Sequence, residues 1–345
     1  MRVTLLAALA LSTICATTNA QPVPGARWDS ISGAAAAAWS PDSLRAIGKF
    51  VEALGSGAVV VIDDGRLVAQ WGEPSRKFPL ASVRKSLLSS LVGIEVARGH
   101  LRIDATLASL AIDDAPALTP VERSARVVDL LGARSGVYHA SAYEPQSMQA
   151  SRPARESSKP GERWFYNNWD FNTLGTIYEH ASGHGIFDAF ATEIAGPIGM
   201  QDYRPSDGAY VRETVSQHAA YTFRMSARDL ARYLLLYMRG GRWGERQVVP
   251  QDWVEASTRG GSDAGDGGAY GLLWWIARDG RLMPGVTFEP GTFAARGNGP
   301  HYAIAIPSRN LIIVHLADTE TPSPSNWVDR KDVGAVVRRI LAAKF

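Results

Sequence analysis

Two residues that could form a nucleophilic pair, Ser82 and Lys85, lie in the segment FPLASVRKSLLSSLVGIEVARGH at residues 78–100. Apolar residues recur at helical spacing after the pair, which predicts a helix that begins at the serine and buries one face. Because side chains three positions apart lie on the same side of a helix, the hydroxyl and the amine can touch. A serine becomes nucleophilic when a base takes its proton, and a lysine deprived of water can be neutral enough to do so. The alternative is a helix N-cap followed by a surface lysine.

A tyrosine offers a third reactive group. The segment KPGERWFYNNW at residues 159–169 contains a Pro-Gly turn, and its Tyr166 precedes a helix expected to begin near Asp170. A phenol close to a lysine and a serine can relay a proton, since a neighbouring ammonium lowers the pKa of the phenol. The alternative is a buried tyrosine beside a capping asparagine. On the first interpretation this segment presents Tyr166 to a cleft.

The order of these features resembles the serine β-lactamase and penicillin-binding-protein superfamily. The likeness is closer to its class C branch, which includes DD-peptidases, esterases and 6-aminohexanoate-dimer hydrolases. It covers roughly residues 40–345 and implies a β-lactamase-like fold. The segments that carry it are, in chain order, Ser82-Val83-Arg84-Lys85, Leu130-Leu131 with residues 132–137, Pro160-Gly161-Glu162, Tyr166-Asn167-Asn168, and the late strands within residues 291–316.

The resemblance implies roles for single positions. It makes Ser82 the nucleophile, Lys85 the residue that activates it, and Tyr166 the group that passes a proton to the leaving group. Asn168 matches the third position of Tyr-x-Asn and would hold a substrate amide. The neighbouring Asn167 leaves that last choice open.

The superfamily's third motif, Lys-Thr-Gly on the strand beside the site, has no equivalent lysine in this chain. The corresponding segment reads GTFAARGNG at residues 291–299, and no lysine lies between Lys159 and Lys331. Residues 292–294 or residues 296–298 could occupy the motif. In both cases the ammonium that receives a β-lactam or peptide carboxylate is missing, which argues against penicillin-type substrates.

Four further positions are candidates for substrate contact. Arg296, Gly297 and Asn298 lie on the strand that would complete the site, and Arg296 could face a substrate carboxylate, although a solvated arginine is the alternative. The resemblance implies an oxyanion hole from the N–H of Ser82 and one N–H of this strand, at about 3 kcal/mol per donor. Tyr143 is similar in placement to a substrate-facing tyrosine of the aminohexanoate-dimer hydrolases.

Metal chemistry and an α/β-hydrolase site are not expected. His180 and His184 have the spacing of two metal ligands, but glycines at 183 and 185 interrupt the helix and no acidic third ligand is near. The chain has no Gly-x-Ser-x-Gly elbow. No cofactor or metal is therefore predicted.

The composition indicates the class of protein, and the N-terminal segment indicates its cellular location. The 345-residue chain is 46% apolar with a formal net charge of +2 and scattered basic residues, which is typical of a globular protein without a nucleic-acid stripe. Residues 1–20 have the pattern of a cleavable signal peptide ending at Ala20, too short to span a bilayer. The single cysteine, Cys15, lies within it, so the mature chain would have no thiol. We expect a periplasmic or secreted protein without stable membrane insertion.

Elements at both ends of the chain must position the site. The sequence predicts a helix after Ser40, a hairpin about Asp63-Asp64-Gly65, and a terminal helix at 329–341. It also predicts strands within residues 270–276, 291–295, 301–307 and 311–316. Between them lie mainly helical patterns. These predict an α+β fold, with an antiparallel sheet formed by N- and C-terminal segments, flanking helices and an α-rich middle region. The expected division is a linker at 21–39 and one domain at 40–345, with an α/β part at 40–80 and 265–345 and an α-rich part at about 81–264.

The sequence thus predicts an exported, metal-independent serine hydrolase that cleaves a small ester or amide through an acyl-enzyme. A DD-peptidase or true β-lactamase is the nearer alternative, which the missing lysine disfavours. A catalytically idle binding or scaffolding protein is the rival from another class. The sequence does not identify the natural substrate or the oligomeric state.

Overall fold

The computed structural model describes residues 23–321 and 328–345. The predicted signal peptide, with Cys15, lies outside the described residues. Within these ranges, no helix combines the length and the apolar character that crossing a membrane requires.

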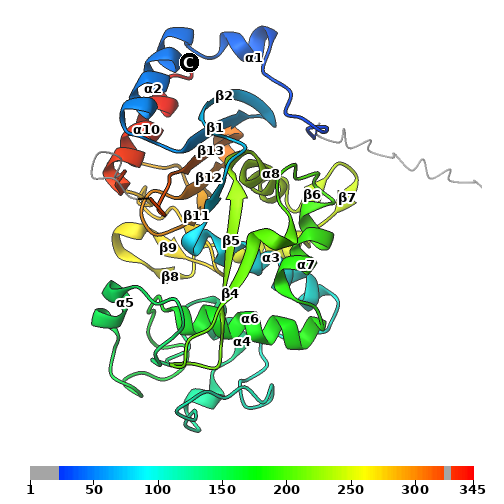
Figure 1. Ribbon diagram of the computed structural model, residues 1–345, viewed down its shortest axis with the longest axis vertical. Helices are drawn as coiled ribbons and strands as arrows, with labels where there is room; N and C mark the ends of the chain where they lie inside the picture. Colours follow the sequence, from blue (N-terminus) through cyan, green and yellow to red (C-terminus); the bar gives the residue numbers. More distant parts are fainter. Residues whose placement is uncertain (1–22, 322–327) are drawn as a thin grey trace, which may run out of the picture.

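An antiparallel sheet joins the two ends of the chain (Figure 1). Among the described residues it has eight strands in the order β2-β1-β13-β12-β11-β10-β9-β8. The central pairing places β1 directly against β13, with Ala58 opposite Leu316. The predicted fold class and its antiparallel sheet are therefore confirmed. The strands are β1 (Ala58–Asp63), β2 (Arg66–Gly72), β8 (Ser262–Asp263), β9 (Ala269–Tyr270), β10 (Trp275–Ile276), β11 (Phe293–Arg296), β12 (Tyr302–Ile306) and β13 (Leu311–Leu316).

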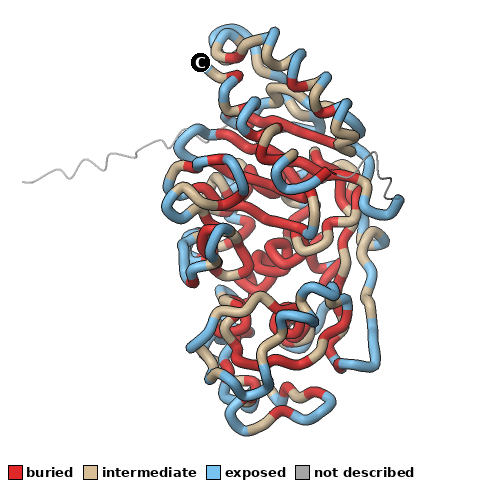
Figure 2. The backbone as a smooth tube through the Cα atoms, turned by 90° about the vertical axis from the view of Figure 1, so that its left-hand side faces the viewer, coloured by how far each residue is buried: buried red, intermediate tan, exposed pale blue. Residues whose placement is uncertain are grey.

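Helices bury both faces of this sheet. Helices α2 (Pro41–Ala53) and α10 (Arg330–Ala342) cover one face, and α8 (Ala227–Met238) lies on the other, where α3 (Arg84–Ala97) contributes to the same hydrophobic core. Alternate residues of β1 accordingly enter different cores, because successive side chains of a strand point to opposite faces. Figure 2 shows the result as a continuous buried layer through the middle of the molecule.

The middle of the chain forms a helical region beside the sheet, at the lower end of the molecule in Figure 1. It also contains a three-stranded sheet in the order β3-β5-β4, which the sequence patterns did not predict. Helix α8 belongs to this stretch of sequence but packs on the main sheet, whereas α3 packs mainly against other helices of the region. The remaining elements are α4 (Val127–Leu131), α5 (Gln146–Ser151), α6 (Asn168–Ser182), α7 (Ile186–Phe190), α9 (Gln251–Ser257), β3 (Lys77–Pro79), β4 (Gly208–Val211), β5 (Ala220–Ser226), β6 (Arg242–Trp243) and β7 (Arg246–Gln247).

The segment expected as a linker, residues 21–39, contacts the domain over its later part. It contains the short helix α1 (Gly33–Ala37) and a bridge between Ser30 and Leu67 at the edge of the sheet. Trp39 is buried, and its indole N–H donates to Asp63 Oδ2 at 2.8 Å. These residues are thus attached to the sheet rather than separate from it.

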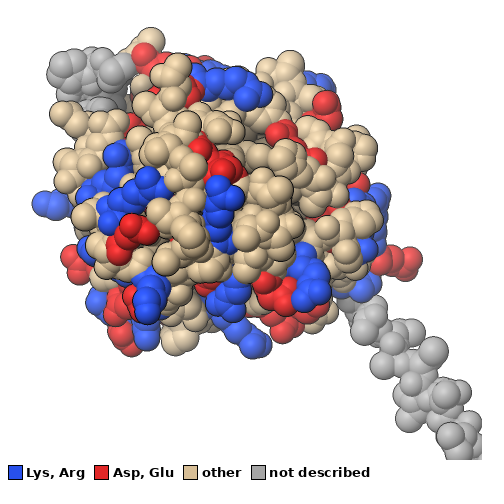
Figure 3. All heavy atoms as spheres, turned by 90° about the horizontal axis from the view of Figure 1, so that it is seen from below, with Lys and Arg blue, Asp and Glu red and all other residues tan. Residues whose placement is uncertain are grey.

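Charged side chains of both signs are interspersed on the face that Figure 3 displays. This distribution agrees with the small net charge of +2.

Candidate active site

The predicted nucleophile, Ser82, lies on a tight turn between β3 and α3. Ala81–Val83 form one 3₁₀ turn, and α3 begins at Arg84. Ala81 has φ +45°, a left-handed conformation that residues with a Cβ seldom adopt and that surrounding structure must enforce. The Ser82 hydroxyl does not cap the helix, which differs from an ordinary N-cap serine. It is instead hydrogen-bonded to Lys85, with 2.6 Å between Oγ and Nζ.

Lys85 is enclosed by protein. Its side chain is only 1% exposed, and its Nζ lies 5.1 Å from the ring centre of Tyr166 and 5.0 Å from that of Phe171. It makes no ion pair with any described residue. Burial, and secondarily the charge of Arg84, holds the pKa of Lys85 well below its usual value. The amine is therefore suited to accept a proton, and Ser82 O–H can donate to it.

Tyr166, the third predicted reactive group, comes from a different part of the chain. It follows the turn at Pro160-Gly161, where Gly161 has φ +83°, and lies two residues before α6 begins. Burial raises the pKa of the Tyr166 phenol, while the neighbouring Ser82 hydroxyl and the Arg84 charge act in the opposite direction. The phenol thus remains protonated in the resting site and can donate a proton.

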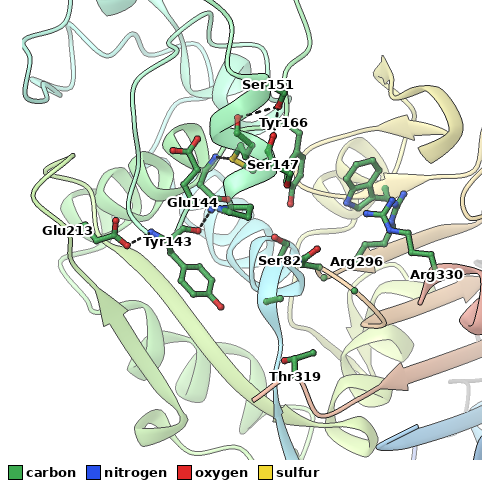
Figure 4. A pocket seen from close by; sticks show the side chains of 18 residues that line it. Ser82, Tyr143, Glu144, Ser147, Ser151, Tyr166, Glu213, Arg296, Thr319 and Arg330 are labelled. Carbon is green, nitrogen blue, oxygen red and sulfur yellow. Dashed lines mark hydrogen bonds between the residues drawn. The ribbon is translucent and has the colours of Figure 1, made fainter. Parts of the chain in front are cut away.

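These groups lie at a cleft of about 820 Å³. Seven of the eight predicted site residues line it, and Lys85 lies behind Ser82. In Figure 4, Ser82 is central, with Tyr143 and Glu213 on one side and Arg296 and Arg330 on the other. The predicted residues at the cleft are Ser82, Tyr143, Tyr166, Asn168, Arg296, Gly297 and Asn298.

The end of β11 forms the wall beside the serine. A Cβ on Gly297 would lie 2.7 Å from the carbonyl oxygen of Leu80, so this strand approaches the nucleophile turn as closely as only glycine permits. Of the two alternatives for the third motif, residues 296–298 therefore lie beside Ser82. Thr292 is buried and does not line the cleft.

Arg296 is engaged by its own protein. It is 6% exposed, its guanidinium stacks 4.0 Å from the ring centre of Trp275, and it donates to the carbonyl of Leu282 at 3.1 Å. Burial lowers its pKa from the ordinary arginine value. These contacts differ from the expectation of an arginine extended toward a substrate carboxylate.

The two asparagines after Tyr166 have different environments. Asn167 Oδ1 accepts from the N–H of Asp170 at 2.9 Å and so caps α6. Asn168 lines the cleft, and its Nδ2 donates to the carbonyl of Tyr143 at 2.6 Å. Tyr143 is 42% exposed at φ +59°, and its N–H donates to Glu213. Asn168 therefore supports the wall that presents Tyr143.

Several residues at the cleft were not predictable from the sequence. Glu144 is paired with Arg152, whereas Glu213 and Arg330 make no ion pair within the described part of the chain. None of the three belongs to a segment with a recognisable spacing, and only the folded chain brings them beside Ser82. No cluster of three or more His, Cys, Asp or Glu side chains suited to a metal ion occurs among the described residues.

Comparison with known proteins agrees with this geometry. Three solved structures share the fold. A candidate 6-aminohexanoate-dimer hydrolase from Bacillus anthracis has a TM-score of 0.67 and 19% identity, over 92% of this chain and 86% of that chain. A candidate beta-lactamase from Bacteroides dorei has a TM-score of 0.62 and 17% identity (87% and 98% of the two chains), and an octameric penicillin-binding protein homologue from Pyrococcus abyssi has a TM-score of 0.62 and 19% identity (88% and 78% of the two chains). A search of curated proteins gave no match to this sequence.

The sequence model of one protein family matches residues 45–337, which include the nucleophile turn, the Tyr166 segment and the strand at Gly297. The match extends over most of the chain. The protein therefore belongs to the beta-lactamase family.

Proposed function

We propose that the protein is an exported serine hydrolase that cleaves a small ester or amide through an acyl-enzyme on Ser82. The observation that carries the proposal is the 2.6 Å contact between Ser82 Oγ and a buried lysine amine at the floor of the cleft. Family membership supports hydrolase chemistry. Export depends on the predicted signal peptide at residues 1–20.

In the first step, Ser82 Oγ attacks the substrate carbonyl carbon and its proton passes to Lys85 Nζ. The carbonyl oxygen gains the negative charge. The backbone N–H of Ser82 and that of Asn298 are the donors we assign to it, because both residues line the cleft. The Gly297 N–H is already bonded to the His301 carbonyl at 2.8 Å and is therefore not assigned to the oxyanion.

In the second step, the bond to the leaving group breaks. Tyr166 donates its proton to the departing oxygen or nitrogen and regains one from Lys85, so that the alcohol or amine leaves neutral. Water then attacks the acyl-enzyme by the same route in reverse, releases the acid and restores the Ser82 hydroxyl.

The proposal is tested with 4-nitrophenyl butyrate, a neutral ester. The parent should hydrolyse it, and Ser82→Ala should reduce kcat by roughly 1000-fold or more because the nucleophile is gone. An unchanged circular dichroism spectrum would show that the variant is folded. Equal turnover by a folded Ser82→Ala protein would refute the assignment.

A second candidate, hydrolysis of carboxylate-bearing amides as by a DD-peptidase or β-lactamase, is favoured by Arg330. This exposed guanidinium lines the cleft and has no ion pair with the described residues. It could therefore offset the desolvation of a substrate carboxylate. Arg330→Gln should lower kcat/KM for nitrocefin, which bears a carboxylate. The variant's kcat/KM for nitrophenyl butyrate should stay within about twofold of the parental value. A preference for nitrophenyl butyrate in the parent supports the first function, and a preference for nitrocefin supports the second.

A further inference from the structure

Arg84 is a buried cation without a carboxylate partner. It is the first residue of α3 and is 0% exposed. No described carboxylate lies within ion-pair distance of it, and its Nε and Nη1 atoms have no hydrogen-bond partner. Burying a charge without a counter-ion is costly, so an ordinary structural role does not explain this residue.

Two contacts hold the Arg84 guanidinium in place. Its carbon lies 4.3 Å from the ring centre of Tyr221, and its Nη2 donates to Asn172 Oδ1 at 3.0 Å. Asn172 is itself fully buried and donates to the carbonyl of Ala142, the residue before Tyr143. The cation is therefore fixed relative to both the nucleophile helix and the wall of the cleft.

Arg84 is adjacent in sequence to Lys85, which is equally buried and equally without a carboxylate. Two neighbouring buried groups cannot both carry a positive charge at low cost. Arginine does not give up its proton in proteins, whereas a buried lysine does so readily. We propose that Arg84 is a positioning residue, a fixed cation that keeps the Lys85 amine uncharged and thereby ready to take the proton of Ser82.

The buried titratable groups around Arg84, Lys85 and Tyr166 provide no ion-pair partner for the lysine. Asp170, a buried carboxyl of α6, makes no ion pair with a described residue and accepts from the Ser135 hydroxyl, and burial raises its pKa well above the usual value. Burial likewise keeps the neighbouring phenols protonated by raising their pKa. These groups are Tyr166 from the segment before α6, Tyr221 from β5 and Tyr270 from β9, with Ser82 from the nucleophile turn and the more distant Arg296 from β11.

The same cation favours the later proton transfer. Once Lys85 has taken the proton of Ser82, two adjacent buried groups are charged, and their repulsion favours passage of that proton to Tyr166 and the leaving group. Arg84 also lowers the pKa of Tyr166 against the larger effect of burial. It would thus act in both halves of the proton relay without touching the substrate.

This inference rests on the proposed function, and its test separates the two. The rate of labelling by a fluorophosphonate probe is measured from pH 5 to pH 10, and the labelled peptide is identified. In the parent, labelling should occur at Ser82 and decline at low pH as Lys85 becomes protonated. In Arg84→Met, Lys85 should hold its proton more strongly, so this decline should move to higher pH by about one unit or more. The parent and variant rates should converge at high pH.

Two further variants distinguish an effect on Lys85 from a general loss of stability. Asn172→Asp keeps the shape of the side chain but places a carboxylate beside Arg84, and should also move the decline to higher pH. Arg232→Met is the matched control, because Arg232 is a fully buried arginine of α8 that binds the carbonyls of Ile198 and Gly25, away from the cleft. It should lower the melting temperature and leave the pH profile in place.

The outcomes are distinct. A parent that is not labelled at Ser82 would remove the proposed function, and this inference with it. A labelled parent whose pH profile is the same in Asn172→Asp and in folded Arg84→Met would overturn the role of Arg84 alone. A uniform drop in rate at every pH would show that Arg84 is merely structural.

Discussion

At the scale of single residues, the chemistry depends on the difference between Lys85 and an ordinary helix lysine. An exposed lysine is charged at neutral pH, but the Lys85 amine has lost its hydration and faces aromatic rings and another cation. In the proposed mechanism, its lowered pKa is what allows a weakly nucleophilic serine to react.

Lys85→Met should therefore reduce kcat for nitrophenyl butyrate by roughly 100-fold or more, because Ser82 then has no base. The variant should remain folded, since an apolar side chain fits the enclosed site. Lys49→Met, at an exposed position of α2, is the control and should have parental activity. Retention of more than about a tenth of the parental rate by Lys85→Met would mean that another group activates the serine.

Substitution of the two neighbouring asparagines should have different effects, on stability at Asn167 and on substrate turnover at Asn168. Asn167→Ala removes the cap of α6 and should lower the free energy of unfolding by about 1 kcal/mol with little change in kcat/KM. Asn168→Ala should lower kcat/KM, because it releases the wall at Tyr143 and removes a polar group from the cleft. Urea unfolding and ester kinetics on both variants would reveal the reverse pattern if the roles were exchanged.

Spacing in the sequence was sufficient to predict the contact of Ser82 with Lys85, since both lie on one helical turn. It could not predict the surroundings of Arg296, because Trp275 and Leu282 reach it only through the folded sheet. The same holds for Glu213 and Arg330, which are far apart in the chain and line the same cleft only in the folded protein.

At the scale of elements, the site depends on the approach of β11 to the nucleophile turn. Gly297 allows that approach, since an added Cβ would lie 2.7 Å from the Leu80 carbonyl and 2.9 Å from the Cβ of His301. The strand and the turn together would supply both oxyanion donors, so their separation should matter more to the reaction than to the fold.

Gly297→Ala should lower kcat by about tenfold or more, because it forces this strand away from Ser82. Some loss of stability, about 1 to 3 kcal/mol, is expected from overpacking. Gly291→Ala is the control before the same strand: it has φ +83° but open space around it, so it should cost stability and spare kcat. Parental kcat in Gly297→Ala would contradict the assigned oxyanion hole.

Elements with strong local patterns were predictable, and those defined by tertiary contacts were not. The hairpin of β1 and β2 and strand β13 follow from β-branched runs and turn residues. The segment 270–276, predicted as one strand, is divided into β9 and β10 by a turn. Helix α3 is buried around most of its circumference, from Arg84 to Glu95, so its packing exceeds the one-sided stripe that the sequence indicated.

At the scale of the whole molecule, the two ends of the chain stabilise one sheet. Asp63 of β1 accepts from Trp39 and from Lys344 near the C-terminus, at 2.8 and 2.9 Å. Two buried histidines lie in the same C-terminal part. His315 is hydrogen-bonded through both ring nitrogens, at 2.7 Å to the Pro300 carbonyl and 2.9 Å to Ser56 Oγ.

Stability should therefore decrease in mild acid. Burial lowers the pKa of His301 and of His315 to about 4, from 6.5 for an exposed histidine. As the pH falls, the histidines of the unfolded chain bind protons before those of the folded chain. The contribution of the two neutral histidines to the free energy of unfolding is therefore fully present above pH 6.5 and is lost between pH 6.5 and 4, at roughly 1.4 kcal/mol per pH unit for each histidine. Urea unfolding at several pH values measures this slope. His301→Leu should reduce it by about half of the two-histidine contribution, and an unaltered slope would contradict the effect of burial on His301.

If Ser82 carries the acyl group of the proposed intermediate, that intermediate can be trapped. The parent is mixed with nitrophenyl butyrate, quenched in acid within the first turnovers and digested, and the peptides are examined by mass spectrometry. The account predicts a butyryl group on Ser82, with no such adduct in Ser82→Ala. A butyryl group on another residue of an active enzyme, or turnover with no covalent intermediate at any quench time, would contradict it.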